Sequence, residues 1–91
     1  MKKSAYIRVY GIVQGVGMRY SVYRKAVGLK LSGYVKNMMD GSVEIRAEGE
    51  EQDIMKLLDY IKTGIPWARV DDVQVVWAEY GGKFRGFEIT Y

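Results

Sequence analysis

The sequence contains no cysteine and no histidine. Without cysteine, the chain forms no disulfide and offers no thiolate to a metal or to an electrophile. Without histidine, it lacks the side chain that most often acts as a base near neutral pH and as a metal ligand. Any chemistry must therefore use arginine, lysine, carboxylates, amides, hydroxyl groups or the backbone.

Long apolar runs are also missing, since no stretch approaches the roughly 18 residues of a membrane span. The N-terminal segment MKKSAYIRVY begins with lysines and meets Arg8 before an apolar segment forms, so no secretory signal is expected. These features predict a cytoplasmic protein with no membrane partner. The length of 91 residues, of which 48% are hydrophobic, predicts a single domain over 1–91 with one modest core.

The net charge is only +3 at pH 7, which mildly favours an anionic partner. Nucleic acid and a small phosphate compound are both candidates. The basic residues are interleaved with acidic ones, as in VEIRAEGEEQD, and this argues against an extended stripe that follows a nucleic-acid backbone.

Segments rich in β-branched and aromatic residues predict strands over 5–13, 33–39, 42–49, 70–80 and 84–91. The dipeptide Asp40-Gly41 predicts a hairpin between the second and third strands, because glycine accepts positive φ. In the third strand, apolar residues alternate with Glu44, Arg46 and Glu48. This alternation predicts one face in the core and one face in solvent.

Two helices are predicted from apolar stripes at helical spacing. The first covers 19–31, with its inward stripe at Val22, Ala26 and Leu29. The second carries the clearest stripe in the chain, and Gly64 and Pro66 end it. That stripe consists of Ile54, Leu57, Leu58 and Ile61.

The predicted order is β-α-β-β-α-β-β. With right-handed crossovers, the first six elements form an α+β, ferredoxin-like βαββαβ sandwich, with two helices on one face of a mainly antiparallel sheet. The segment 84–91 adds an extra C-terminal strand. This fold hosts enzymes, RNA binders and metal carriers, so the function must be inferred from a site.

The segment GIVQGVGMR connects the first predicted strand to the first helix. Gly15 and Gly17 allow successive backbone N–H groups to turn toward one anion, at the positive end of a helix dipole. Arg19 at this position costs about 0.3–1 kcal/mol unless an anion binds beside it. The pattern alone equally fits a flexible turn followed by a solvated arginine.

Asn37 is the second candidate site residue. Asparagine is depleted in strands, and alternation places Asn37 on the face of Val35, the expected helix side. An amide there needs a partner or a ligand. The alternative is an asparagine that begins the turn toward Asp40. Because the first helix connects the first two strands, the end of the second strand is expected near the glycine loop.

Taken together, these two segments resemble the acylphosphatase family. GIVQGVGMR matches the family pattern G-x-V-Q-G-V-x-F-R except at Met18, and GYVKNMMDGSVEI matches G-F/Y/W-V-x-N followed by D-G-S/T-V. The similarity continues through AEG and GIPWARVDDV to the terminal GFEI, and so covers nearly the whole chain. It implies an enzyme that hydrolyses the carboxyl-phosphate bond of acyl phosphates to a carboxylate and inorganic phosphate.

The resemblance also assigns roles. It implies that the loop Gln14–Arg19 holds the phosphate, that Arg19 binds it and that Asn37 positions the attacking water. It implies no metal and no other cofactor, inorganic phosphate as product and competitive inhibitor, no nucleic-acid partner, and a monomer. The amides of the implied phosphate cradle are those of Gly15, Val16, Gly17, Met18 and Arg19.

This chemistry is consistent with the missing histidine. The leaving group of an acyl phosphate is a carboxylate with a pKa near ~4, so it departs without a proton from a general acid. We expect a phosphate oxygen of the substrate to take the proton of the water, since no convincing base is present.

Two positions depart from the family pattern. Met18 replaces the usual aromatic residue, and a small effect is expected because methionine fills irregular gaps. Lys30 stands where the family usually has the glycine that ends the first helix, while Gly28 lies within that helix. The sequence therefore leaves open how the helix ends.

Three other functions are compatible with the predicted fold. An RNA-binding module of this fold could use Tyr6, Tyr10 and Tyr34 on its sheet, but the recognition-motif pattern is missing. A metal chaperone would need a cysteine pair. A catalytically silent acylphosphatase-like domain is argued against by intact Arg19 and Asn37.

The remaining conspicuous residues have structural interpretations. Trp67 is expected to anchor its loop rather than to flank a substrate entrance, and Trp77 to contact the core or a sheet edge. Tyr91 is expected at a sheet edge without a role. Asp71 and Asp72 are expected in a solvated turn, because adjacent strand residues face opposite ways.

Overall fold

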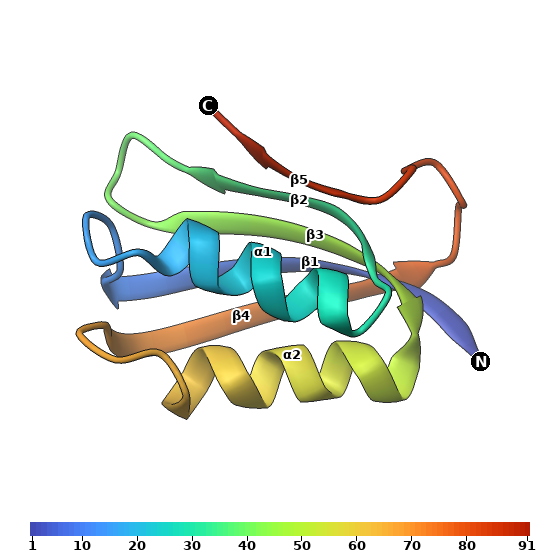
Figure 1. The fold of residues 1–91 in the computed structure, drawn as a ribbon, viewed down its shortest axis with the longest axis horizontal. Helices are drawn as coiled ribbons and strands as arrows, with labels where there is room; N and C mark the ends of the chain where they lie inside the picture. The colour runs from blue at the N-terminus through green and yellow to red at the C-terminus, as the bar shows by residue number, and fades with distance from the viewer.

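The computed structural model describes residues 1–91. It contains one sheet with both helices on one of its faces (Figure 1). The predicted βαββαβ order with an additional C-terminal strand is confirmed, although the first helix and the last strand are shorter than predicted. The elements are β1 (Lys2–Ile12), α1 (Met18–Gly28), β2 (Ser32–Asn37), β3 (Val43–Glu50), α2 (Glu51–Thr63), β4 (Arg69–Glu79) and β5 (Phe87–Thr90).

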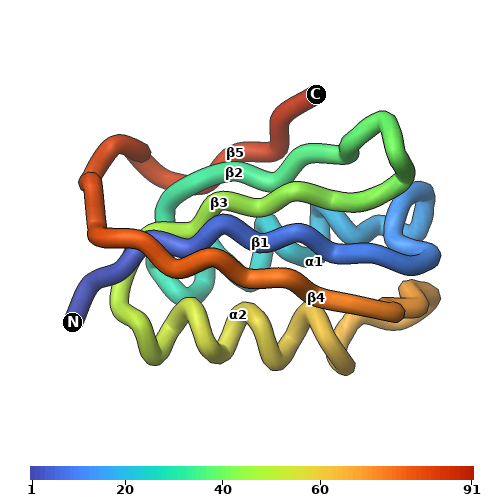
Figure 2. Tube along the Cα trace, turned by 180° about the vertical axis from the view of Figure 1, so that it is seen from behind, coloured from blue at the N-terminus to red at the C-terminus, as the bar shows by residue number.

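The strands lie in the order β4-β1-β3-β2-β5 (Figure 2). β1 is antiparallel to both β3 and β4, and β2 is antiparallel to β3. β5 is parallel to β2, with Thr90 opposite Lys36. The chain therefore ends beside the last residue of β2, which is Asn37.

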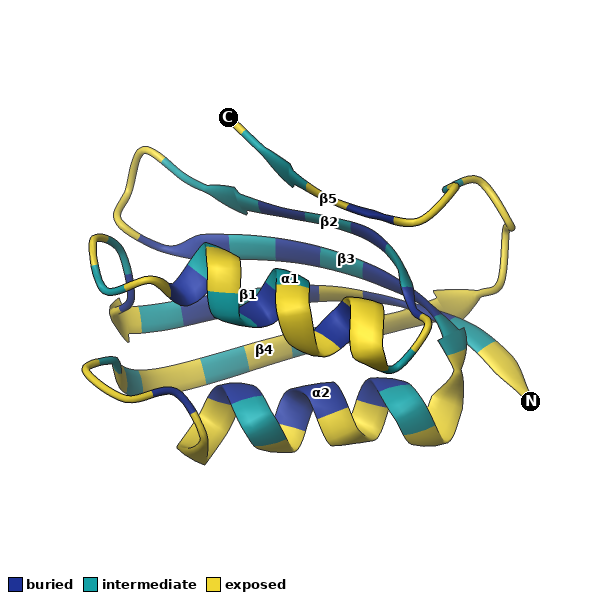
Figure 3. Cartoon of the chain, viewed as in Figure 1, coloured by how far each residue is buried: buried dark blue, intermediate teal, exposed yellow.

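The core lies between the sheet and the helices (Figure 3). The inward faces of the central strands and the predicted stripe of α2 are buried, as expected from their periodicity. Each fully buried aliphatic side chain contributes about 1.5–3 kcal/mol to folding. In α1, Val22 and Ala26 are buried, whereas Leu29, the C-cap that follows the helix, is only partly buried.

Glu48 corrects the expectation of a solvated outer face on β3. Its side chain is 1% exposed, and its carboxylate accepts hydrogen bonds from the backbone N–H groups of Gly81 (3.1 Å) and Lys83 (3.2 Å). Burying a carboxylate is costly unless donors satisfy it. The loop that precedes β5 supplies those donors, so Glu48 fastens this loop over the sheet.

The outer face of the sheet is occupied by contacts within the chain. The guanidinium of Arg46 lies over the ring of Tyr6, with 3.9 Å from its central carbon to the ring centroid, and near Phe84. The Tyr34 hydroxyl donates to Glu44 at 2.8 Å. Burial, followed by the hydrogen bond to Glu44, raises the pKa of Tyr34 to about 12. These internal partners weaken the RNA-binding alternative further, because stacking on bases needs free rings.

The structure tests three predictions about β4 and the loop that precedes it. Trp67 is 87% exposed with φ 70°, so its predicted role as a loop anchor is wrong. Trp77 lies on the edge strand β4, which agrees with the second of its two expected positions, the core or a sheet edge. Asp71 and Asp72 lie within β4 rather than in a turn, and Asp71 pairs with Arg69 at 3.1 Å.

The hydrogen bonds at the C-terminal end of α1 show how the helix ends with Lys30 in place of the usual glycine. The N–H of Leu31 donates to the carbonyl of Ala26 (2.9 Å), and that of Lys30 to the carbonyl of Val27 (3.0 Å). This pair of bonds is a Schellman motif, whose C′ residue is left-handed. Lys30 occupies that residue with φ 59°, a conformation that is unfavourable for a side chain with a Cβ.

We predict that Lys30→Gly raises the free energy of unfolding by about 0.5–1 kcal/mol, because glycine adopts the left-handed conformation freely. Gly28→Ala is a companion variant: position 28 is helical with open space for a Cβ, so alanine should also stabilise. Urea unfolding measures both. An unchanged or lower stability of Lys30→Gly would show that the cap carries no strain.

Candidate active site

The loop from β1 to α1 places unpaired backbone donors at one point. Gly15 and Gly17 are left-handed, with φ of 75° and 79°. Gly17 is the N-cap of α1, no side chain caps this end, and the first turn holds no acidic residue. Since the first N–H groups of a helix have no acceptor within it, this end of α1 has the features that favour the binding of an anion.

Gln14 holds this loop against the hairpin that follows β2. Its side-chain N–H₂ group donates to the carbonyl oxygens of Met38 (2.7 Å) and Ser42 (2.8 Å). From the sequence alone, Gln14 is only the first residue of the loop, and these two hydrogen bonds are not predicted. Its hydrogen bonds bring the glycine loop next to the strand end that carries Asn37.

The hairpin is itself closed by polar contacts. The N–H of Ser42 donates to Asp40 at 2.9 Å, and the N–H of Met38 donates to the carbonyl of Ser42 at 2.8 Å. Hydrogen bonds from the Ser42 hydroxyl and N–H lower the pKa of Asp40, and nearby Arg8 adds a smaller effect. Gln14 therefore binds a turn that is already ordered.

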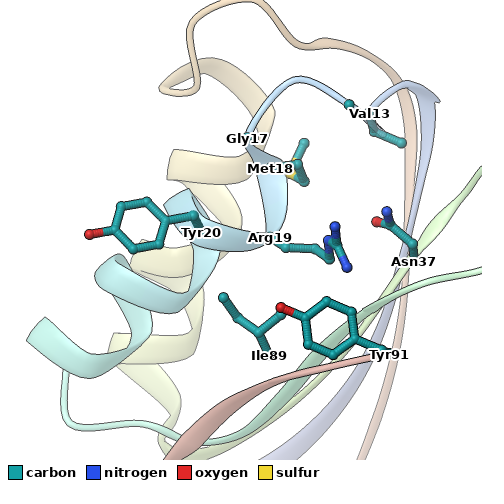
Figure 4. A pocket seen from close by; sticks show the side chains of 9 residues that line it. Val13, Gly17, Met18, Arg19, Tyr20, Asn37, Ile89 and Tyr91 are labelled. Carbon is teal, nitrogen blue, oxygen red and sulfur yellow. The ribbon is translucent and has the colours of Figure 1, made fainter.

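A cavity of about 290 Å³ lies where the loop, β2 and β5 meet. Arg19 extends into it from α1 and Asn37 from β2, and the two side chains point toward one another (Figure 4). The structure thus brings together the two side chains that the sequence singled out. The lining residues are Val13, Gly15, Gly17, Met18, Arg19, Tyr20, Asn37, Ile89 and Tyr91.

Asn37 holds the one buried side-chain polar atom without a hydrogen-bond partner. This atom is the amide oxygen, Oδ1. A buried acceptor left unpaired costs about 1–3 kcal/mol, so such atoms are rare in folded proteins. The expected alternative, an asparagine that serves the hairpin turn, would have given Oδ1 a backbone partner.

Two other residues of the cavity need comment. Met18 is 1% exposed and packs in the core. That methionine replaces an aromatic residue there at little cost stays a prediction. Tyr91 lines the cavity, although the sequence assigned it no role. Only the parallel register of β5 on β2 would have located Tyr91, and residue patterns do not reveal that register.

The structure is a ferredoxin-like α+β fold with one cavity that is lined by an uncapped helix end, an arginine and an unpaired amide, which are features that favour anion binding. Comparisons with known proteins identify the family of the chain. The acylphosphatase family model matches residues 5–89. The chain belongs to the acylphosphatase family, enzymes that hydrolyse the carboxyl-phosphate bond of acyl phosphates.

Individual relatives agree with this assignment. An acylphosphatase of Caldanaerobacter subterraneus is 54% identical and aligns over 98% of this chain and 99% of its own length. One from Bacillus licheniformis is 46% identical over 93% of this chain and 94% of its own. The crystal structure of acylphosphatase from Bacillus subtilis superposes with a TM-score of 0.93 at 41% identity, and the match covers both chains completely.

The structure shows neither a membrane-spanning helix nor a cluster of metal ligands. No helix is long and apolar enough to cross a membrane. No group of three or more carboxylates is arranged to hold a metal ion.

We predict that Asn37→Leu raises the free energy of unfolding by about 1 kcal/mol, because an apolar side chain of similar size removes the unpaired acceptor. Gln74→Leu, at an exposed position of β4, is the matched control and should change stability by less than about 0.5 kcal/mol. Thermal unfolding followed by circular dichroism measures both. Destabilisation by Asn37→Leu would mean that the amide stabilises the fold.

Proposed function

We propose that the cavity around Arg19 and Asn37 is the active site for acyl phosphate hydrolysis. The phosphoryl group lies in the Gln14–Arg19 loop, where the backbone amides of residues 15–19 and the guanidinium of Arg19 bind its oxygens. The observation that carries this proposal is the unpaired Oδ1 of Asn37 in the same cavity as Arg19.

Electrostatics supports this placement of the phosphoryl group. A guanidinium binds two oxygens of a phosphate as a planar fork, and bonds between charged groups are about twice as strong as neutral ones. The N-terminus of α1 adds a partial positive charge and free N–H groups. An anion there turns the unfavourable position of Arg19 into a favourable one, and the same groups stabilise the charge of the transition state.

Asn37 positions the water in this mechanism. Its Oδ1 accepts a hydrogen bond from the water, which attacks phosphorus in line with the departing carboxylate. The carboxylate leaves without a proton because its pKa is near ~4. The proton of the water passes to a phosphate oxygen of the substrate, since no aspartate, glutamate or histidine side chain lines the cavity.

The same lining supports hydrolysis without a metal or another cofactor, since hard cations require several carboxylate or carbonyl oxygens and the lining side chains offer one such atom, Oδ1 of Asn37. Inorganic phosphate, as the product, competes with the substrate for the loop. We propose that the protein works as a single-domain monomer over 1–91 in the cytoplasm.

We predict that turnover of an aryl acyl phosphate continues in excess chelator and that inorganic phosphate raises KM without lowering kcat. The reason is a phosphate site built from amides and one guanidinium. Initial rates with and without chelator, and at several phosphate concentrations, measure both effects. A strong loss of turnover in chelator that added metal restores would contradict the proposal.

We predict that Arg19→Lys lowers kcat/KM at least ~10²-fold, because lysine keeps the charge but loses the planar fork. The matched control is Arg24→Lys, an exposed position on the same helix outside the cavity, which should leave the rate unchanged. Circular dichroism checks that both variants fold. An Arg19→Ala variant with parental activity would remove Arg19 from the site.

We predict that Asn37→Asp loses at least ~10²-fold in kcat. A carboxylate beside the phosphoryl group repels it by roughly 4 kcal/mol at 4 Å and an effective dielectric constant near 20, and each 1.36 kcal/mol is tenfold in rate. Gln52→Glu, exposed in the first turn of α2, makes the same change of net charge as a control. A general base at position 37 would favour the carboxylate instead, so an Asp variant as fast as the parent would contradict the neutral role of Asn37.

A further inference from the structure

The C-terminal residue, Tyr91, follows β5 directly and lines the cavity. β5 runs parallel to β2 with Val35 opposite Ile89 and Lys36 opposite Thr90. One further step along both strands places Tyr91 beside Asn37 on the face that carries the helices. Figure 4 shows the ring of Tyr91 below the guanidinium of Arg19.

The ring has no place in the hydrophobic core. Tyr91 is 91% exposed, whereas Phe87 at the start of β5 is 6% exposed and belongs to the core. Packing energy therefore does not explain an aromatic residue at position 91. Its contact is with Arg19, whose guanidinium carbon lies 5.0 Å from the ring centroid, within the range of a cation–π interaction.

Arg19 lacks any other partner that would fix its orientation. It forms no ion pair and no side-chain hydrogen bond within the chain. A free arginine side chain samples many rotamers, and binding a phosphate requires that it give up most of them. The cation–π contact with the Tyr91 ring is therefore the one interaction available to orient the guanidinium before a ligand binds.

We infer that Tyr91 is a positioning residue that holds the Arg19 guanidinium in the cavity in its phosphate-binding orientation. The inference rests on the proposed function of Arg19. The two interactions of the guanidinium are compatible. The aromatic ring contacts the flat face of the guanidinium, whereas the N–H groups that donate to phosphate lie in the plane of the guanidinium. The fifth strand thus adds to the six-element fold a group that prepares the arginine for binding.

This role predicts which kinetic constant changes. Without the ring, Arg19 loses rotamer freedom only when the phosphoryl group binds, so binding weakens. Once bound, the arginine makes the same contacts, and the chemical step is unaffected. An exposed cation–π pair corresponds to about a two- to fivefold change in an equilibrium constant.

Three variants test this inference. Tyr91→Leu removes the ring, and Tyr91→Phe keeps it without the hydroxyl. Tyr80→Leu is the matched control, since Tyr80 forms a similar exposed pair with Lys2, at 5.2 Å, outside the cavity. The measurements are the dissociation constant of inorganic phosphate, from the rise of the melting midpoint with phosphate concentration, and KM and kcat for an aryl acyl phosphate.

We expect Tyr91→Leu to raise the phosphate dissociation constant and KM together by about two- to fivefold with kcat unchanged. Tyr91→Phe and Tyr80→Leu should behave like the parent. Parental or tighter phosphate binding by Tyr91→Leu, or a failure of phenylalanine to restore it, would overturn the inference.

The parent and Arg19→Lys separate this failure from a failure of the proposed function. If the parent depends on Arg19 while Tyr91→Leu binds phosphate normally, only the role of Tyr91 is overturned. If parental turnover does not depend on Arg19, the proposed function fails and the inference fails with it.

Discussion

The hydrogen bonds from Gln14 to the carbonyls of Met38 and Ser42 are the constraint on which the site depends. The loop that follows is rich in glycine, and glycine loses the most conformational freedom on folding. The Gln14 side chain, at the start of the loop, binds the hairpin and so limits this freedom. It also fixes the distance between two elements that are far apart in sequence, the start of α1 and the end of β2. The ferredoxin-like core places both elements at one end of the sheet, and Gln14 joins them.

The site concentrates features that are unfavourable for folding alone. Arg19 lies at the positive end of a helix dipole, Gly17 leaves that helix end uncapped, and Oδ1 of Asn37 is buried without a partner. An anion with a water beside it would satisfy all three groups at once. The apolar residues buried on β1, β3 and α2 supply enough folding free energy to offset these unfavourable features. The fold therefore tolerates a site whose polar groups lack partners when no ligand is bound.

Periodic patterns predicted the scaffold well, because burial of one face determines them. The stripe of α2 and the alternation of β3 identified their elements, and Asp40-Gly41 located the hairpin. Features that depend on contacts distant in sequence were not predictable in this way. Glu48 looked solvated because its donors come from a loop more than thirty residues later, and Trp67 looked buried because tryptophan usually is. The motifs singled out Arg19 and Asn37, whereas the clamp by Gln14 and the position of Tyr91 required the register of the sheet.

The most direct test of the central claim, that the amides of residues 15–19 and Arg19 form one phosphate site, is a titration of the ¹⁵N-labelled protein with inorganic phosphate, followed by amide chemical shifts. The account predicts saturable shifts that are largest for the amides of 15–19, together with a change at the side-chain amide of Asn37. All of these should follow one dissociation constant and be lost in Arg19→Ala. Shifts that do not saturate, or that centre on the exposed basic residues Arg24 and Lys25, would contradict it.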